Sequence, residues 1–110
     1  MAGPSQILSG QTRIYKWTLT TADPTGRAII VGMRGDGSVQ AFGTFGGGTV
    51  TLDLSLCLTE EYYFAAKDYG GTLIALTADG GMDIKQRTYR LRPKITGSTG
   101  ATVTVLVLLA

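Results

Sequence analysis

The ten residues from Thr49 to Leu58 constrain the fold more than any other part of the chain. Their even positions are aliphatic, and their odd positions are small or polar. Side chains alternate between the two faces of an extended strand, so this period of two predicts a strand with one buried face and one hydrated face. No helix has a period of two. Three glycines at 46–48 precede the stretch and allow the backbone to turn into it.

The rest of the chain repeats short apolar or alternating runs, separated by turns rich in glycine. We expect further strands over residues 13–20, 27–33, 38–45, 72–78, 84–95 and 102–109. Residues 60–66 could form a helical turn and a half or an aromatic strand, and their three consecutive aromatic residues favour the strand. Pro93 predicts an edge or a bend in the 84–95 strand, because proline donates no hydrogen bond to a ladder. The aliphatic strand 102–109 must lie inside a sheet or pair with another molecule, since an exposed apolar edge aggregates. Gly35-Asp36-Gly37 predicts a tight hairpin between strands 27–33 and 38–45.

About eight short strands without a convincing helix predict an all-β protein, a single-domain β-sandwich or jelly roll, with a partly open barrel as the alternative. At 110 residues the chain has room for one core. We expect a flexible N-terminal arm over residues 1–11 and the sandwich domain over residues 12–110. The arm is small and polar except for Ile7 and Leu8, and an arm of this kind becomes ordered when it lies on another surface.

Composition points to a protein with a covered surface. Charged residues make up 16% of the chain, against about 25% in average proteins. Either another protein covers part of this small domain, or neutral Thr, Ser and Gly hydrate it. No leading segment reads as a secretory signal, and no apolar run reaches the ~20 residues of a membrane span. A single cysteine, Cys57, excludes an internal disulfide and suits synthesis in a reducing compartment.

The sequence contains few of the residue types on which enzyme catalysis usually depends. Histidine is absent, which removes the commonest general base and the commonest metal ligand. Cys57 has no base near it in sequence, and we expect a small, half-buried side chain there. The segment 79–83 resembles a calcium loop but lacks its remaining oxygen ligands, so a turn is the better interpretation. We therefore predict no enzymatic activity, no cofactor and no bound metal.

A basic stretch is the clearest partner-facing signal. Five of the ten basic residues fall within ten positions, namely Lys85, Arg87, Arg90, Arg92 and Lys94. Nucleic acid, an acidic protein surface, or an edge strand protected by charge would each account for it. The tripeptide Arg34-Gly35-Asp36 falls at the expected hairpin tip, where a tight turn explains it without a receptor.

Taken as a whole, the profile of a Gly- and Thr-rich chain with short strands, a polar N-terminal arm and no histidine or disulfide resembles the small cement, staple or decoration proteins of tailed-bacteriophage capsids. The resemblance spans the full length as a pattern and includes no motif from which a functional residue can be transferred. It implies a jelly-roll-like domain, made in the host cytoplasm and located on the virion, that forms dimers or trimers. Such a domain clamps neighbouring major capsid subunits.

On this basis we expect a viral structural protein that binds the capsid surface, with itself and the major capsid protein as partners and no membrane. The residues expected to carry the contacts are Ile7, Leu8, Tyr62, Tyr63, Tyr69, Arg87, Arg90 and Arg92. A head-to-tail joining or tail protein is the first alternative. A nucleic-acid-binding β-barrel is the second, and a carbohydrate-binding module using Trp17 and the tyrosines is the third.

Overall fold

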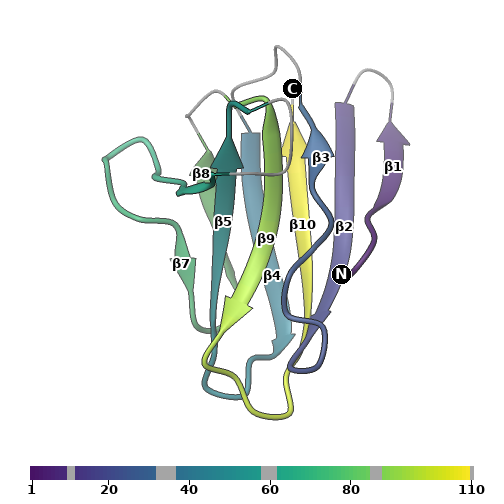
Figure 1. Cartoon of the computed structure of the whole chain (residues 1–110), viewed down its shortest axis with the longest axis vertical. Helices are drawn as coiled ribbons and strands as arrows, with labels where there is room; N and C mark the ends of the chain where they lie inside the picture. The colour runs from purple at the N-terminus through teal and green to yellow at the C-terminus, as the bar shows by residue number, and fades with distance from the viewer. Residues whose placement is uncertain (10–11, 32–36, 58–61, 85–87, 110) are drawn as a thin grey trace.

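Two antiparallel sheets face each other and enclose one core (Figure 1). The computed structural model describes residues 1–9, 12–31, 37–57, 62–84 and 88–109, with the backbone alone for residues 7–9 and 12. One sheet, here the β10 sheet, has the order β1 (Ser5–Ser9), β2 (Thr12–Thr20), β10 (Thr102–Leu109), β4 (Gly37–Thr44) and β8 (Gly80–Ile84). The other, the β5 sheet, has the order β3 (Ile29–Ile30), β9 (Arg90–Thr96), β5 (Thr49–Ser55) and β6 (Phe64–Ala65), and β7 (Ala75–Leu76) also pairs with β5.

The fold is therefore an all-β sandwich of the predicted class, and the described residues contain no helix. Its inner faces come from the alternation that the sequence displays. Val50, Leu52 and Leu54 of β5 are buried and point toward the buried valines of β10. Trp17 of β2 is fully buried between the sheets, and its indole Nε1 donates a hydrogen bond to the Arg27 carbonyl at 3.0 Å.

The strand β5, which the sequence predicts over residues 49–58, differs from its expected form in two respects. Its odd face is not hydrated throughout, because Asp53 and Ser55 are both buried. Its even face does not stay buried, because Leu56 follows the end of the strand and is 69% exposed. Leu58 lies outside the described residues. The alternation thus predicts the strand and its inner face correctly, while neighbouring segments cover the other face.

The strand expected over 84–95 is in fact two strands in different sheets. β8 ends at Ile84 at an edge of the β10 sheet, and β9 begins at Arg90 between β3 and β5. Pro93 therefore sits in an interior strand. The Pro93 carbonyl accepts a hydrogen bond from Gly26 N, so the Pro93 nitrogen also faces the 24–26 segment and not β5. The 24–26 segment pairs only through isolated bridges. The missing N–H of Pro93 therefore removes no hydrogen bond from the ladder between β9 and β5.

The expected hairpin between 27–33 and 38–45 is also wrong. β3 pairs with β9 and β4 pairs with β10 and β8, so the connection between β3 and β4 crosses from one sheet to the other. The tripeptide Arg34-Gly35-Asp36 lies outside the described residues. β4 itself follows the prediction, with Val39 and Ala41 buried. Near its end Gly43 has φ +130°, and a Cβ there would collide with the Thr102 carbonyl of β10.

The chain ends lie on the sandwich. Residues 5–9, expected as part of a flexible arm, form the edge strand β1, which pairs with β2 from Ser5 opposite Lys16 to Ser9 opposite Thr12. Ala2 is buried and exchanges backbone hydrogen bonds with Thr25 and Arg27. The difference arises because β2 has an open edge on which these residues complete a ladder. β10 lies between β2 and β4, so of the two placements expected for the strand 102–109 the structure shows the one inside a sheet.

Candidate partner-binding surfaces

The basic residues of β9 share one face of the β5 sheet. Arg90, Arg92 and Lys94 are spaced by two, so their side chains point to the same outer side of the strand. All three are half-buried. Arg87 and Lys85 lie outside the described residues, so the expected five-residue stretch is described for these three alone.

A carboxylate from the neighbouring strand lies among these cations. Asp53 of β5 stands opposite Arg92 in the register. Its Oδ2 is 3.2 Å from Arg92 Nε and 3.6 Å from Lys94 Nζ, and its side chain is only 8% exposed. A nearly buried carboxylate between two cations fixes both of them against β5. We call Asp53, Arg92 and Lys94 the ion cluster.

Aromatic rings cover the basic side chains. The Arg92 guanidinium lies 3.8 Å from the centre of the Tyr63 ring, within the range of a cation–π contact. The Arg90 guanidinium lies 5.6 Å from the Tyr89 ring, and Arg90 Nε donates to the Cys57 carbonyl. Tyr63 therefore packs onto the domain itself, and its contact with a partner stays a prediction.

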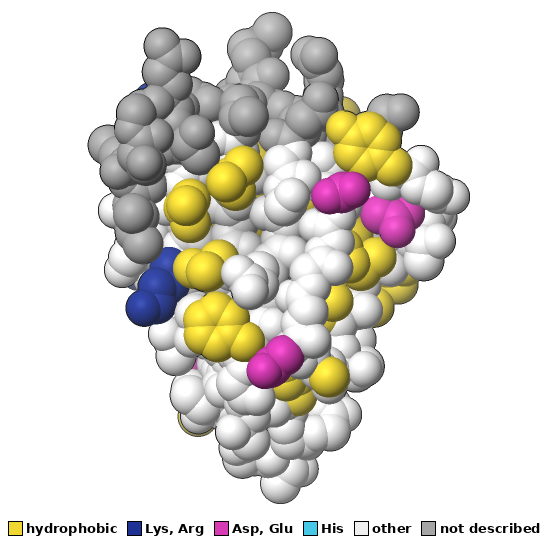
Figure 2. All heavy atoms as spheres, turned by 180° about the vertical axis from the view of Figure 1, so that it is seen from behind, with side chains coloured by type: hydrophobic (Ala, Val, Ile, Leu, Met, Phe, Trp, Pro, Cys, Tyr) yellow, Lys and Arg dark blue, Asp and Glu magenta, His cyan; other side chains and the backbone are white. Residues whose placement is uncertain are grey.

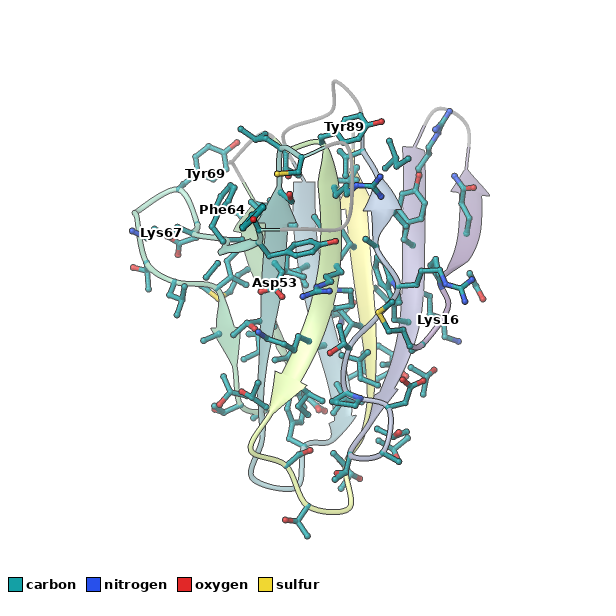
Figure 3. The ribbon with its side chains drawn as sticks, viewed as in Figure 1. Lys16, Asp53, Phe64, Lys67, Tyr69 and Tyr89 are labelled. Carbon is teal, nitrogen blue, oxygen red and sulfur yellow. The ribbon has the colours of Figure 1, made fainter. Side chains whose placement is uncertain are left out.

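Three other aromatic side chains remain exposed beside this face. Tyr62 is 82% exposed, Tyr69 is 53% exposed and Phe64 is 43% exposed. Figure 3 shows Phe64, Lys67 and Tyr69 around the loop between β6 and β7, to one side of Asp53. We call Tyr62, Phe64 and Tyr69 the aromatic edge. Rings that remain in water on a small domain are the type of side chain that anchors protein interfaces.

Local backbone features hold the aromatic edge in place. The Asp68 carboxylate accepts hydrogen bonds from Gly70 N and Thr72 N, both at 2.9 Å, and so closes the turn that carries Tyr69. Tyr62 has φ +53°, a left-handed conformation that is uncommon for an aromatic residue. Such conformations concentrate at functional positions, where the surrounding structure holds them.

The opposite side of the sandwich presents a different surface. On the outer face of the β10 sheet, Ile14, Leu106 and Leu108 are half-buried and Phe42 is exposed. Figure 2 shows apolar side chains gathered on this side of the molecule. Ile14, Leu106 and Leu108 line a shallow hollow of about 180 Å³ together with Ser38 and Gln40. We call Ile14, Phe42, Leu106 and Leu108 the apolar face.

The expected contact residues are thus divided between the two sheets. Tyr62, Tyr63, Tyr69, Arg90 and Arg92 all lie on or beside the β5 sheet. Ile7 and Leu8 belong to β1 at the edge of the β10 sheet, where their backbones stand opposite Ile14 and Arg13. The structure therefore does not bring the N-terminal segment together with the basic and aromatic residues.

Sequence reasoning did not select Asp53, Lys94 or the apolar face as contact residues. A signal for the apolar face exists, because Val105 to Leu109 is aliphatic at both parities. One parity fills the core, and the other must face outward. No comparable signal exists for Asp53, whose burial depends on Arg92 and Lys94 about forty positions later in the chain.

The described part of the chain offers no group of three or more His, Cys, Asp or Glu residues that could hold a metal ion. Cys57 is a free cysteine with a half-buried side chain, as the sequence predicts. Among the described residues, no helix is long and apolar enough to cross a membrane.

No protein-family model and no curated protein matches the chain. Solved structures do include similar chains. A cupin domain from Bordetella pertussis Tohama I superimposes with a TM-score of 0.51 at 16% identity, over 99% of this chain and 93% of that one. A carbohydrate-binding module of Cellvibrio mixtus lichenase 5A, solved in complex with cellotriose, aligns with a TM-score of 0.33 at 12% identity, over 100% of this chain and 89% of that one. The cupin domain supports the two-sheet β-sandwich architecture and carries no information on activity.

Proposed function

We propose that this chain is a non-enzymatic structural protein that decorates the outer surface of a viral capsid as a small homo-oligomer and stabilises contacts between major capsid subunits. The observation that carries the proposal is the aromatic edge, three exposed rings beside a row of half-buried basic side chains. The absence of histidine favours binding over catalysis.

The geometry suits a rigid contact with a large partner. Tyr63 and Asp53 hold Arg92 in place, and Asp68 closes the turn beside Tyr69, so these groups lose little freedom on binding. Tyrosine and arginine are the residue types that dominate binding energy in protein interfaces. A shell carries many copies of such a domain, so each contact need bury only about 1,000 Å².

The test is binding of the purified chain to expanded, undecorated shells. We expect binding at micromolar concentration or tighter. The double variant Tyr62→Ala/Tyr69→Ala is expected to lose at least about ten-fold in affinity, because each removed anchor costs on the order of 1 kcal/mol or more. Thr44→Ala, an exposed change at the end of β4, is the matched control and should bind as the parent does.

Absence of binding by the parent chain at micromolar concentration would contradict the proposal. Equal binding by the double variant would remove the aromatic edge from the contact. A ring of six or twelve copies in solution would instead favour the alternative of a head-to-tail joining or tail protein.

Nucleic-acid binding is the second candidate, and the row of Arg90, Arg92 and Lys94 on one face of β9 is what favours it. The ion cluster weakens this candidate, because Asp53 already lies within 4 Å of both Arg92 and Lys94. Binding of a single-stranded oligonucleotide that weakens steeply with salt would support it.

A further inference from the structure

The apolar face occupies the middle strands on the outer side of the β10 sheet, between Lys16 of β2 and the exposed Asp83 of the edge strand β8, which stands opposite Ser38. Three rows cross β2, β10 and β4 on the outer side of the β10 sheet: Ile14–Leu108–Ser38, Lys16–Leu106–Gln40 and Thr18–Thr104–Phe42. Lys16 is the one charged residue in these rows, and it stands on β2, to one side of the centre. Two leucines therefore occupy the centre of a face with no charge on its middle strand.

We infer that this face is the surface through which two copies of the chain associate, with β10 of one copy lying across β10 of the other. The inference deepens the homo-oligomer in the proposed function and rests on that part of it alone. It requires no capsid, so it can be tested in solution.

The available area fits a pair of copies. Five strands about 4.8 Å apart span about 24 Å, and strands that average seven residues at about 3.3 Å per residue run about 23 Å. Two such faces in contact bury about 1,100 Å² in total, which is close to the lower end of the range for specific interfaces. Sheets that pack face to face lie about 10 Å apart with their strands within about 30° of each other, so a pair would form a second, smaller core.

The pattern on the face is self-complementary. A two-fold axis parallel to β10 places β2 of one copy over β4 of its partner while keeping each row in register. Leu106 and Leu108 then meet their own equivalents. Ile14 lies over the partner's Ser38, and Lys16 lies over the partner's Gln40. No like charges face each other, so the arrangement carries no repulsion that would exclude a second copy.

The first test is the mass of the chain in solution, measured by light scattering between about 1 and 100 μM. We expect a dimer. Leu106→Asp places a charge at the centre of the face and is expected to raise the dimer dissociation constant at least about a hundred-fold, because an unpaired charge must be desolvated on both sides of the axis. The matched control is Thr96→Asp, which adds the same charge at an exposed position of β9 and should leave the dimer intact.

A positive test covers the case in which Leu106→Asp fails to fold. In a Cys57→Ser background, Leu106→Cys brings two thiols together across the axis, and mild oxidation should give a disulfide-linked dimer in high yield. Thr96→Cys should give none beyond the background of random collisions. A parent chain that is monomeric at 100 μM, or a dimer that Leu106→Asp leaves unchanged, would overturn the inference.

Shell binding separates this inference from the proposed function. A folded Leu106→Asp monomer should still bind shells through the aromatic edge, more weakly because the second binding site of the dimer is lost. A dimer that binds no shells would contradict the capsid role and leave the dimer face standing. A shell contact abolished by Leu106→Asp in a monomeric parent would assign the apolar face to the capsid and refute the dimer.

Discussion

The outer faces of the two sheets differ in the kind of side chain that they present to solvent. On the β5 sheet, Asp53 is nearly buried yet paired with Arg92 and Lys94, and Tyr63 covers the guanidinium. On the β10 sheet, Leu106 and Leu108 leave aliphatic surface partly in water. The first face pairs its buried carboxylate within one molecule, whereas the second is the face that the inferred dimer would cover.

The largest effect that tests this contrast is expected from Asp53→Ala. It leaves Arg92 beneath Tyr63 without its carboxylate, and we expect a loss of about 2 kcal/mol in the free energy of unfolding, less than for a fully buried pair because Lys94 is partly solvated. Asp83→Ala, at an exposed position of β8, is the control and should change stability by less than about 0.5 kcal/mol. Urea denaturation measures both. Equal effects would show that the ion cluster is no more important than a surface charge.

A second change tests how the β5 sheet satisfies its buried polar groups. The Thr88 hydroxyl accepts a hydrogen bond from Ser55 N and donates to the Arg90 carbonyl at 2.7 Å, where the backbone ladder between β5 and β9 ends. Thr88→Val keeps the shape and removes both bonds, so we expect a loss of about 1 to 2 kcal/mol. Thr88→Ser retains the hydroxyl and should therefore keep most of the free energy of unfolding that Thr88→Val loses. A valine variant as stable as the parent would show that the Thr88 hydroxyl contributes little to the free energy of unfolding.

Binding through the β5 sheet and association through the β10 sheet should depend differently on salt concentration. Shell binding next to Arg90, Arg92 and Lys94 is expected to weaken about three- to ten-fold between about 0.05 and 0.5 M NaCl, because charges at the edge of a contact are screened. The dimer should change less than about two-fold over the same range, since its face is neutral at the centre. Sedimentation at both salt concentrations measures the two equilibria. A dimer that dissociates in salt would point to charged contacts outside the apolar face.

The smallest effect is expected from Leu106→Ser in the isolated monomer. Because Leu106 points outward from β10, its removal should change the unfolding free energy by less than about 0.5 kcal/mol at concentrations below dimer formation. Leu54→Ala, in the core, is the contrast and should cost about 2 to 5 kcal/mol. A large loss for Leu106→Ser would show that the apolar face already supports the single chain.

The strands were predictable where the information is local. β2, β4, β5 and β10 follow the alternation of the sequence, because the alternation of side chains is a property of each strand alone. The assignment of strands to sheets was not predictable. Residues 84–95 read as one strand, yet the chain changes sheets between Ile84 and Arg90. Which sheet a strand joins depends on partners far away in sequence, and the hydrophobic pattern does not encode it.

The candidate surfaces were predictable in the same partial way. The spacing of Arg90, Arg92 and Lys94 places them on one face once β9 is known to start at Arg90. Tyr62 and Tyr69 are exposed as a contact would require, and their partner stays a prediction. Tyr63 was grouped with them because composition does not distinguish a ring that faces solvent from a ring that covers a neighbouring guanidinium.

The interior position of β10 has a consequence for how the molecule is made. β2 and β4 are neighbours of β10 on its two sides and do not pair with each other. During synthesis, β2 and β4 each keep one unpaired backbone edge until β10, which is translated last, pairs with both of them. Chains in which strand pairs join segments distant in sequence fold slowly, and their partly folded intermediates expose apolar surface and unpaired strand edges. We therefore expect refolding from urea to include a slow phase that ends when β10 pairs with β2 and β4.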